Sequence, residues 1–233
     1  MPSPRPPARR RRPGVLARRG VGMEGAVATR RSGRDASAVP HRKRVRRVDE
    51  PGHAHALTWS CWRRLKFLDR DRTRSWVLDA IDRAREKHPS DVWAYVLMPE
   101  HLHLIVCPRA RECDAAAFCA SVKTSVARRA APWVRNNAPD FLPKMPDEQP
   151  NGERADRFWQ RGGGYDRNLT HAGTVKAETD YVHADPVRRG LCGRPEDWRW
   201  SSAADYAGTG PGPGPGPLTP DVGSLPDFGE VSP

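Results

Sequence analysis

Two hydrophobic periodicities divide residues 52–207 into predicted helices and strands. Apolar residues recur at helical spacing over residues 71–88, with charges on the opposite face and Pro89 just after the end. Residues 114–129 show the same pattern, and Asp114 is the predicted N-cap. Three short runs are instead rich in β-branched and aromatic residues, as strands are: residues 55–62, 92–97 and 101–107. The predicted order is strand, helix, strand, strand, helix.

The connection between the second and third strands narrows the choice of fold. It comprises only residues 98–100, which is short enough for an antiparallel hairpin. The element order then indicates an α+β fold, a ferredoxin-like sandwich in which an antiparallel sheet has helices on one face. A short aromatic strand at residues 157–160 and a glycine hinge at residues 162–164 are predicted next. The last predicted helix covers residues 169–185 and stops at Pro186.

Composition separates this folded body from two tails. The chain has 233 residues and a formal net charge of +12, but the first fifty residues alone carry 15 Lys and Arg against 4 Asp and Glu. Residues 1–51, rich in Arg, Pro, Gly and Ala, are predicted to be a disordered arm, because they cannot bury enough surface to offset the entropy of ordering. Such an arm would bind nucleic-acid phosphates, or it is an inert extension. Residues 208–233 begin with a Gly-Pro alternation and are predicted to be a linker-like tail.

Cysteine usage and hydropathy narrow the class of protein. The five cysteines are an odd number without a Cys-x-x-Cys pair, which indicates reduced thiols and argues against a zinc finger. The apolar run near the N-terminus is far too short for a signal or membrane helix. We therefore expect a soluble, cytoplasmic protein with no membrane partner.

The main chemical feature is a His-x-His pair in the predicted strand 101–107. Successive side chains of a strand point to opposite faces, so His101 and His103 project side by side from one face. Two imidazoles supply two nitrogen ligands and leave room for a carboxylate and for substrate oxygens, as in an open, catalytic metal site. The pair is also compatible with two hydrogen-bonded histidines in a core. A second pair, His53 and His55, lies at the start of a strand, where a solvated turn explains it better.

The helix predicted over residues 169–185 carries a polar stripe. At about 3.6 residues per turn, Thr174, Glu178, Tyr181 and Asp185 fall on one side, which should face a cleft. A tyrosine is a poor nucleophile at its usual pKa of about 10, but a metal ion that polarises a phosphodiester makes attack by a positioned phenol feasible. The two histidines and Tyr181 are thus the minimal set for cutting a DNA strand covalently. A tyrosine that only packs is the simpler alternative.

Four motifs, taken in order, resemble one family of transposases. Residues 95–104 (YVLMPEHLHL) are similar to the His-hydrophobic-His motif of the single-tyrosine HUH transposases, most of all to the branch called REP-associated tyrosine transposases. Residues 157–160 (RFWQ) and 164–167 (GYDR) resemble that branch's Phe-Trp-Gln and Tyr-Asp-Arg stretch. Residues 181–191 (YVHADPVRRGL) resemble its catalytic segment, usually Tyr-Ile/Val-x-x-Asn-Pro-Val-Arg-Ala-Gly-Leu, and residues 198–202 (WRWSS) complete the pattern.

This resemblance implies roles for particular residues. Tyr181 would be the nucleophile that forms a 5′-phosphotyrosine link and frees a 3′-hydroxyl. His101 and His103 would hold Mg²⁺ or Mn²⁺, with Asp185 as the third ligand in the place where the family usually has Asn. A carboxylate is a better ligand for a hard cation than an amide, but the same change is compatible with a decayed element.

The expected partner is single-stranded DNA flanked by hairpins, because a lone tyrosine beside one metal ion needs a strand that bends into the site. The predicted DNA contacts are basic or aromatic side chains: Lys123, Arg128, Arg129, Trp159, Arg188 and Arg189. When bound to DNA the protein would be associated with the nucleoid, and the sequence leaves open whether it forms a homodimer.

The leading hypothesis is a metal-dependent transposase that cuts and joins DNA strands. One alternative is a decayed or domesticated protein that binds hairpin nucleic acid without cutting it. Another is a metal-dependent hydrolase, which would leave Tyr181 without a role.

Overall fold

A computed structural model describes most of the chain beyond its first fifty-two residues, in four segments: residues 53–109, 114–149, 152–209 and 218–228. All of them fall within one compact unit, residues 44–233. The predicted arm, residues 1–51, lies outside the described residues, as does most of the Gly-Pro run. None of the helices in these segments is both long and apolar enough to span a membrane.

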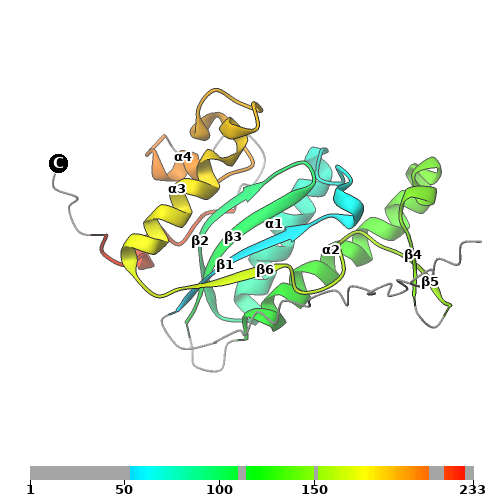
Figure 1. The fold of residues 1–233 in the computed structure, drawn as a ribbon, viewed down its shortest axis with the longest axis horizontal. Coiled ribbons are helices and arrows are strands. Elements are labelled where there is room, and N and C mark those ends of the chain that lie inside the picture. The colour runs from blue at the N-terminus through cyan, green and yellow to red at the C-terminus, as the bar shows by residue number, and fades with distance from the viewer. Residues whose placement is uncertain (1–52, 110–113, 150–151, 210–217, 229–233) are drawn as a thin grey trace, which may run out of the picture. The chain divides into compact units, whose positions relative to one another are not determined.

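The centre of the fold is a four-stranded antiparallel sheet in the order β2-β3-β1-β6 (Figure 1). Its strands are β1 (Ala54–Ser60), β2 (Ser90–Leu97), β3 (His101–Pro108) and β6 (Tyr165–Leu169). Helix α1 (Asp71–Lys87) connects β1 to β2, and α2 (Ala115–Asn137) follows β3. This is the ferredoxin-like order of elements. The predicted α+β class, the antiparallel sheet and the β2–β3 hairpin are confirmed.

Apolar side chains on both faces of the sheet explain where the helices lie. One face contributes Leu57 and Leu104 to a core with α1 and α2. The opposite face contributes Ala56 and Ile105 to a second core with α3 (Ala172–Arg188), and Figure 1 shows α3 across the sheet from the other two helices. The prediction of helices on one face is corrected here: the central strands carry apolar residues on both sides, and each side has to be covered.

The segment after α2 differs from the predicted order. Residues 157–160 form no strand, and Trp159 makes only an isolated bridge with Cys61. The fourth strand of the sheet is β6, and a separate two-stranded ribbon precedes it, made of β4 (Pro146–Glu148) and β5 (Arg154–Asp156). Residues 165–169 are too short and polar to be predicted as a strand, and they form β6 because they pair with β1.

Gly164 allows β6 to approach β1 closely. Its φ is +84°, and a Cβ at this position would overlap the carbonyl oxygen of Thr58. Only glycine, which has no Cβ, avoids both the strain of a positive φ and this overlap. In this structure the end of the predicted glycine hinge is therefore the turn that starts β6.

Helix α3 begins at Ala172, three residues later than predicted, and continues through Pro186 to Arg188. A proline removes one backbone hydrogen bond and normally disfavours a helical residue before it. Here the Arg189 N–H donates to the Asp185 carbonyl at 3.0 Å and closes the last turn. Asp185 consequently stays helical and lies one turn beyond Tyr181.

The described part of the predicted C-terminal tail packs on the sheet. Asp221 Oδ2 accepts a hydrogen bond from the Val92 N–H at 2.8 Å. Leu225 and Phe228 pack against the core on the α3 side. The folded body therefore includes residues 218–228 in addition to residues before the Gly-Pro run.

Candidate active site

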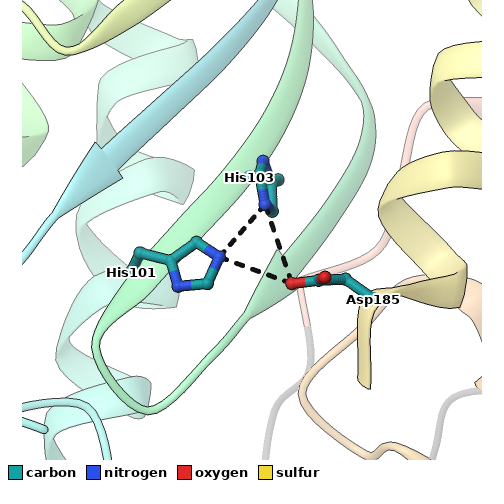
Figure 2. Close-up of side chains that lie close together, drawn as sticks. All are labelled: His101, His103 and Asp185. Carbon is teal, nitrogen blue, oxygen red and sulfur yellow. Dashed lines mark hydrogen bonds and ion pairs between the residues drawn. The ribbon is translucent and has the colours of Figure 1, made fainter. Parts of the chain in front are cut away.

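Strand β3 presents two imidazoles to helix α3. His101 and His103 lie on the α3 side of the sheet, while Leu102 between them belongs to the core on the other side. Figure 2 shows both rings directed at the carboxylate of Asp185. His101 Nε2 lies 3.1 Å from His103 Nε2 and 3.4 Å from Asp185 Oδ2, and His103 Nε2 lies 3.8 Å from the same oxygen. The structure thus brings together the three residues predicted to bind metal.

This His-His-Asp group could hold a metal ion. Its three ligand atoms lie within 4.8 Å of one another. Asp185 Oδ2 is buried and has no hydrogen-bond partner among the described residues, and an unpaired buried carboxylate oxygen is unfavourable unless a cation or a donor meets it. Two imidazole nitrogens and one carboxylate oxygen match a divalent metal site that keeps open positions.

Burial holds both imidazoles in the neutral form that a metal ion requires. Removal from water lowers the pKa of His101, although the nearby carboxylates of Glu100 and Asp185 act in the opposite direction. Burial, together with the neighbouring His101, lowers the pKa of His103 to about 4. A neutral imidazole offers a nitrogen lone pair near pH 7 without first losing a proton.

Polar side chains lie behind both rings of the group. Thr58 Oγ1 lies 2.7 Å from His103 Nδ1. With the His103 proton on Nδ1 and donated to Thr58, Nε2 is the lone-pair nitrogen that faces Asp185. Glu100 Oε1 lies 3.3 Å from His101 Nδ1, so a carboxylate stands behind the second ring as well. The Thr58 contact fixes the orientation of the His103 ring and raises the basicity of its Nε2, whereas Glu100 lies near His101 Nδ1 without a hydrogen bond between them.

Tyr181 lies beside the group and is open to solvent. Its side chain is 52% exposed, and its ring centroid is 6.2 Å from that of His103. The guanidinium of Arg188 lies 4.0 Å from the centre of the tyrosine ring, and it donates to Asp185 Oδ1 and to the Tyr181 carbonyl oxygen, both at 2.8 Å. An exposed phenol next to a possible metal site can reach a phosphodiester without any opening of the core.

The residues predicted to contact DNA fall into two groups. Arg188 and Arg189 lie at the end of α3 beside Asp185, and Arg189 donates to Glu100 Oε1 at 2.9 Å. The other three cations lie on α2, which covers the opposite face of the sheet: Lys123, Arg128 and Arg129. They therefore do not belong to the same site as Tyr181.

Trp159 does not have the position that base stacking requires. It is 6% exposed and packs in the core with Trp59 and Phe158. Its Nε1 donates to the Lys123 carbonyl at 3.2 Å. A buried ring offers no face to a base, so the structure does not support the predicted stacking by Trp159.

Three residues of the site were not predicted from the sequence, namely Thr58, Arg64 and Glu100. Thr58 lies opposite His103 in the β1–β3 pairing, and this register is what identifies it. Arg64 Nη2 lies 3.4 Å from Glu100 Oε1, on a segment that follows β1. Neither Thr58 nor Arg64 belongs to a recognisable motif. Thr58 reaches the site through the register of β1 and β3, and Arg64 reaches it from the turn that follows β1.

Comparisons with known proteins agree with the four motifs. No family model matches the chain. A protein of Haemophilus influenzae named "Putative REP-associated tyrosine transposase" is 26% identical over 139 residues, which are 57% of this chain and 73% of that protein. A solved structure described as a REP-associated tyrosine transposase bound to a REP hairpin is 20% identical with a TM-score of 0.53, covering 75% of this chain and 92% of its own. A transposase structure from Deinococcus radiodurans, described as putative, is 17% identical with a TM-score of 0.37, over 58% of this chain and 92% of its own. The resemblance to REP-associated tyrosine transposases is therefore confirmed in sequence and in fold.

Proposed function

We propose that this protein is a transposase that cuts and joins single strands of hairpin-flanked DNA through Tyr181, with a divalent metal ion at His101, His103 and Asp185. The observation that carries the proposal is an exposed phenol beside two neutral imidazoles and an unpaired, buried carboxylate oxygen. The names of the similar proteins support it, since both the curated relative and the solved structure with the higher TM-score are REP-associated tyrosine transposases. That solved transposase is bound to a REP hairpin, which supports hairpin DNA as the partner here.

Mg²⁺ or Mn²⁺ is the ion that we assign to the three ligands. Hard divalent cations favour oxygen, and the Asp185 carboxylate supplies it beside two neutral imidazoles. When bound, the ion would polarise the phosphate that is to be cut. Thr58 orients His103, one of the residues that would hold the ion, through its contact with Nδ1.

Tyr181 supplies the nucleophile of the proposed reaction. Its hydroxyl oxygen bonds to phosphorus, the bond from phosphorus to the 3′ oxygen breaks, the phenolic proton is lost to solvent, and the departing 3′ oxygen takes up a proton. The strand is left joined to Tyr181 through its 5′ phosphate, and attack by another 3′-hydroxyl then joins two strands. The guanidinium of Arg188 lies 4.0 Å from the centre of the tyrosine ring, so a positive charge stands beside the phosphate that the phenol attacks.

A covalent-adduct assay tests the proposal. The full chain is incubated with hairpin-bearing single-stranded DNA and Mn²⁺, and we expect a protein–DNA adduct that survives denaturation and needs the metal ion. Tyr181→Phe should abolish the adduct and leave DNA binding intact. Tyr165→Phe is the matched control, because Tyr165 has the same 52% exposure but lies on β6. An adduct that persists in Tyr181→Phe would disprove the assignment of the nucleophile.

A second candidate function is binding of hairpin DNA without cleavage. It is favoured by Asp185, which stands where the resembling family usually has Asn. This alternative predicts that the unmodified chain binds hairpin DNA but forms no adduct at any concentration of Mg²⁺ or Mn²⁺. The same assay therefore separates the two functions.

A further inference from the structure

An aromatic cavity of about 390 Å³ lies between α1, α2 and the 3-10 turn Pro139–Lys144 (η2). Its walls are mainly aromatic and aliphatic side chains, among them Phe67, Trp76, Trp133, Phe141 and Phe158. The volume falls within the range of about 300–1,000 Å³ that is usual for small-ligand sites. This part of the core is therefore hollow enough to admit a flat, apolar group.

Cations surround the mouth of this cavity. Lys66, Arg70 and Arg72 line it, and none of these three forms an ion pair in the described part of the chain. The Arg72 guanidinium lies 3.6 Å from the centre of the Trp133 ring, and one carboxylate, that of Asp69, also lines the cavity. The cavity thus combines aromatic walls with more positive than negative charge. This combination fits a ligand that is flat, apolar and joined to anionic groups.

The cavity and the Tyr181 site lie at the same end of the sheet. The Leu68 N–H donates to the Pro99 carbonyl at 2.9 Å, and the Cys61 N–H donates to the Glu100 carbonyl at 2.8 Å. These two bonds hold the segment that leads to Phe67 against the turn that precedes His101. The cavity itself lies on the α1 and α2 side of the sheet, so a DNA strand bound at Tyr181 would pass around this end of the sheet to reach it.

Two exposed arginines stand between the two sites on a strained backbone. Arg63 and Arg64 have φ values of 52° and 54°, in the left-handed region that residues with a side chain rarely adopt. Arg64 shares Glu100 with Arg189, the residue after α3, at 3.4 and 2.9 Å. Basic side chains therefore continue from the end of α3 to the mouth of the cavity. Their charge matches the phosphates of a strand that runs along this path.

We propose that the aromatic cavity binds one unpaired nucleobase of the same DNA strand, with the flanking phosphates on Arg70 and Arg72. A base has two apolar faces that stack on aromatic side chains, and it is always attached to phosphates. The chain's own arm is a poor occupant by charge, because its first fifty residues carry 15 Lys and Arg against 4 acids and would be repelled by the cations at the mouth. This inference rests on the proposed function, since it takes DNA as the ligand of the Tyr181 site.

Base discrimination in DNA binding tests the cavity independently of cleavage. The full chain carrying Tyr181→Phe is titrated, by fluorescence anisotropy, with hairpins that have a single unpaired base at successive positions of the stem and its flank. Each hairpin is compared with the same molecule made abasic at that position. We expect one position at which the abasic DNA binds about 5- to 150-fold more weakly, the range for one base stacked on an aromatic side chain.

Substitutions of residues that line the cavity test whether the cavity causes the difference in binding between intact and abasic DNA. Trp133→Ala should bring the ratio of the two dissociation constants close to one, and Arg72→Ala should weaken the binding of both DNAs. The matched control for charge is Arg83→Ala, since Arg83 is an exposed arginine of the same helix that does not line the cavity, and its ratio should equal that of the parent. If Trp133→Ala does not fold, Phe141→Leu removes an aromatic face from the cavity and keeps an apolar filling.

The outcomes separate this inference from the proposed function. The base pocket would be overturned if the ratio of the two dissociation constants were one at every position. It would also be overturned if the variants Trp133→Ala and Phe141→Leu, both folded, had the same ratio as the parent. If base discrimination depends on Trp133 but the chain forms no covalent adduct with DNA, the base pocket stands and the proposed cleavage is refuted. If the chain forms the adduct but shows no base discrimination, the proposed cleavage stands and the base pocket is refuted.

Discussion

Asp185→Asn should have opposite effects on the metal-free and the metal-bound protein. Without metal, the buried Oδ2 of Asp185 lacks a hydrogen-bond partner among the described residues, while Oδ1 is held by Arg188 at 2.8 Å. An asparagine keeps an acceptor for Arg188 and brings an amide N–H toward the lone-pair nitrogens of His101 and His103. The substitution therefore relieves an unfavourable buried charge and removes the anionic ligand of the proposed metal ion.

The expected size of both effects follows from the geometry. An unsatisfied buried polar group costs about 1–3 kcal/mol, so the metal-free variant should be more stable than the parent by about 1 kcal/mol or more. A ligand at a hundred times its dissociation constant stabilises the native state by about 2.7 kcal/mol. If the loss of the carboxylate charge weakens Mn²⁺ binding about tenfold, the same Mn²⁺ concentration should stabilise the variant by only about 1.4 kcal/mol.

Thermal unfolding with and without Mn²⁺ measures both numbers. In a domain of this size, 1 kcal/mol corresponds to about 2–4 °C in Tm, so we expect Tm to rise in the chelated variant and the Mn²⁺-induced rise to be halved. Asp180→Asn is the matched control, because Asp180 lies on the same helix with a 63% exposed side chain paired with Lys176. If Asp185→Asn lowers the metal-free Tm and leaves the Mn²⁺ effect at the parental value, Asp185 is a structural partner of Arg188 and the metal assignment is wrong.

Three further substitutions test the surroundings of His103, the burial of His183 and the approach of β6 to β1. Thr58→Val removes the partner of His103 Nδ1, and calorimetry should show Mn²⁺ affinity falling about 10- to 100-fold; an unchanged affinity would mean that this contact does not orient the ring. Burial lowers the pKa of His183 to about 4, below its value of about 6.5 in the unfolded chain. The neutral, buried ring therefore makes its full contribution to the free energy of unfolding above pH 6.5, and this contribution is lost as the pH falls toward 4. Denaturant titrations at pH 7 and pH 5 should therefore give a pH-dependent loss that is about 2 kcal/mol smaller in His183→Gln than in the parent, and equal losses would refute this origin. Gly164→Ala places a Cβ against the Thr58 carbonyl at a positive φ, and should cost at least about 1–3 kcal/mol of unfolding free energy; a variant of parental stability would contradict the tight β6–β1 approach.

Local patterns were sufficient to predict a large part of this molecule. The alternation of side chains along a strand puts His101 and His103 on one face whatever surrounds them, and helical spacing puts Tyr181 and Asp185 one turn apart. The three-residue connection before His101 likewise predicted the hairpin that the structure contains. These features depend only on neighbours along the chain, so they could be predicted before any tertiary contact was known.

The tertiary structure decided which of these local features meet. It placed α3 on the face of the sheet opposite α1 and α2, which brings Asp185 to the two imidazoles and leaves Lys123 on the other side. It also placed Thr58 behind His103 through strand register, and buried Trp159 in the core. Each of these outcomes depends on contacts between segments that are distant in sequence, because the face that a helix covers and the register of a strand follow from the apolar surface that the assembled fold must bury.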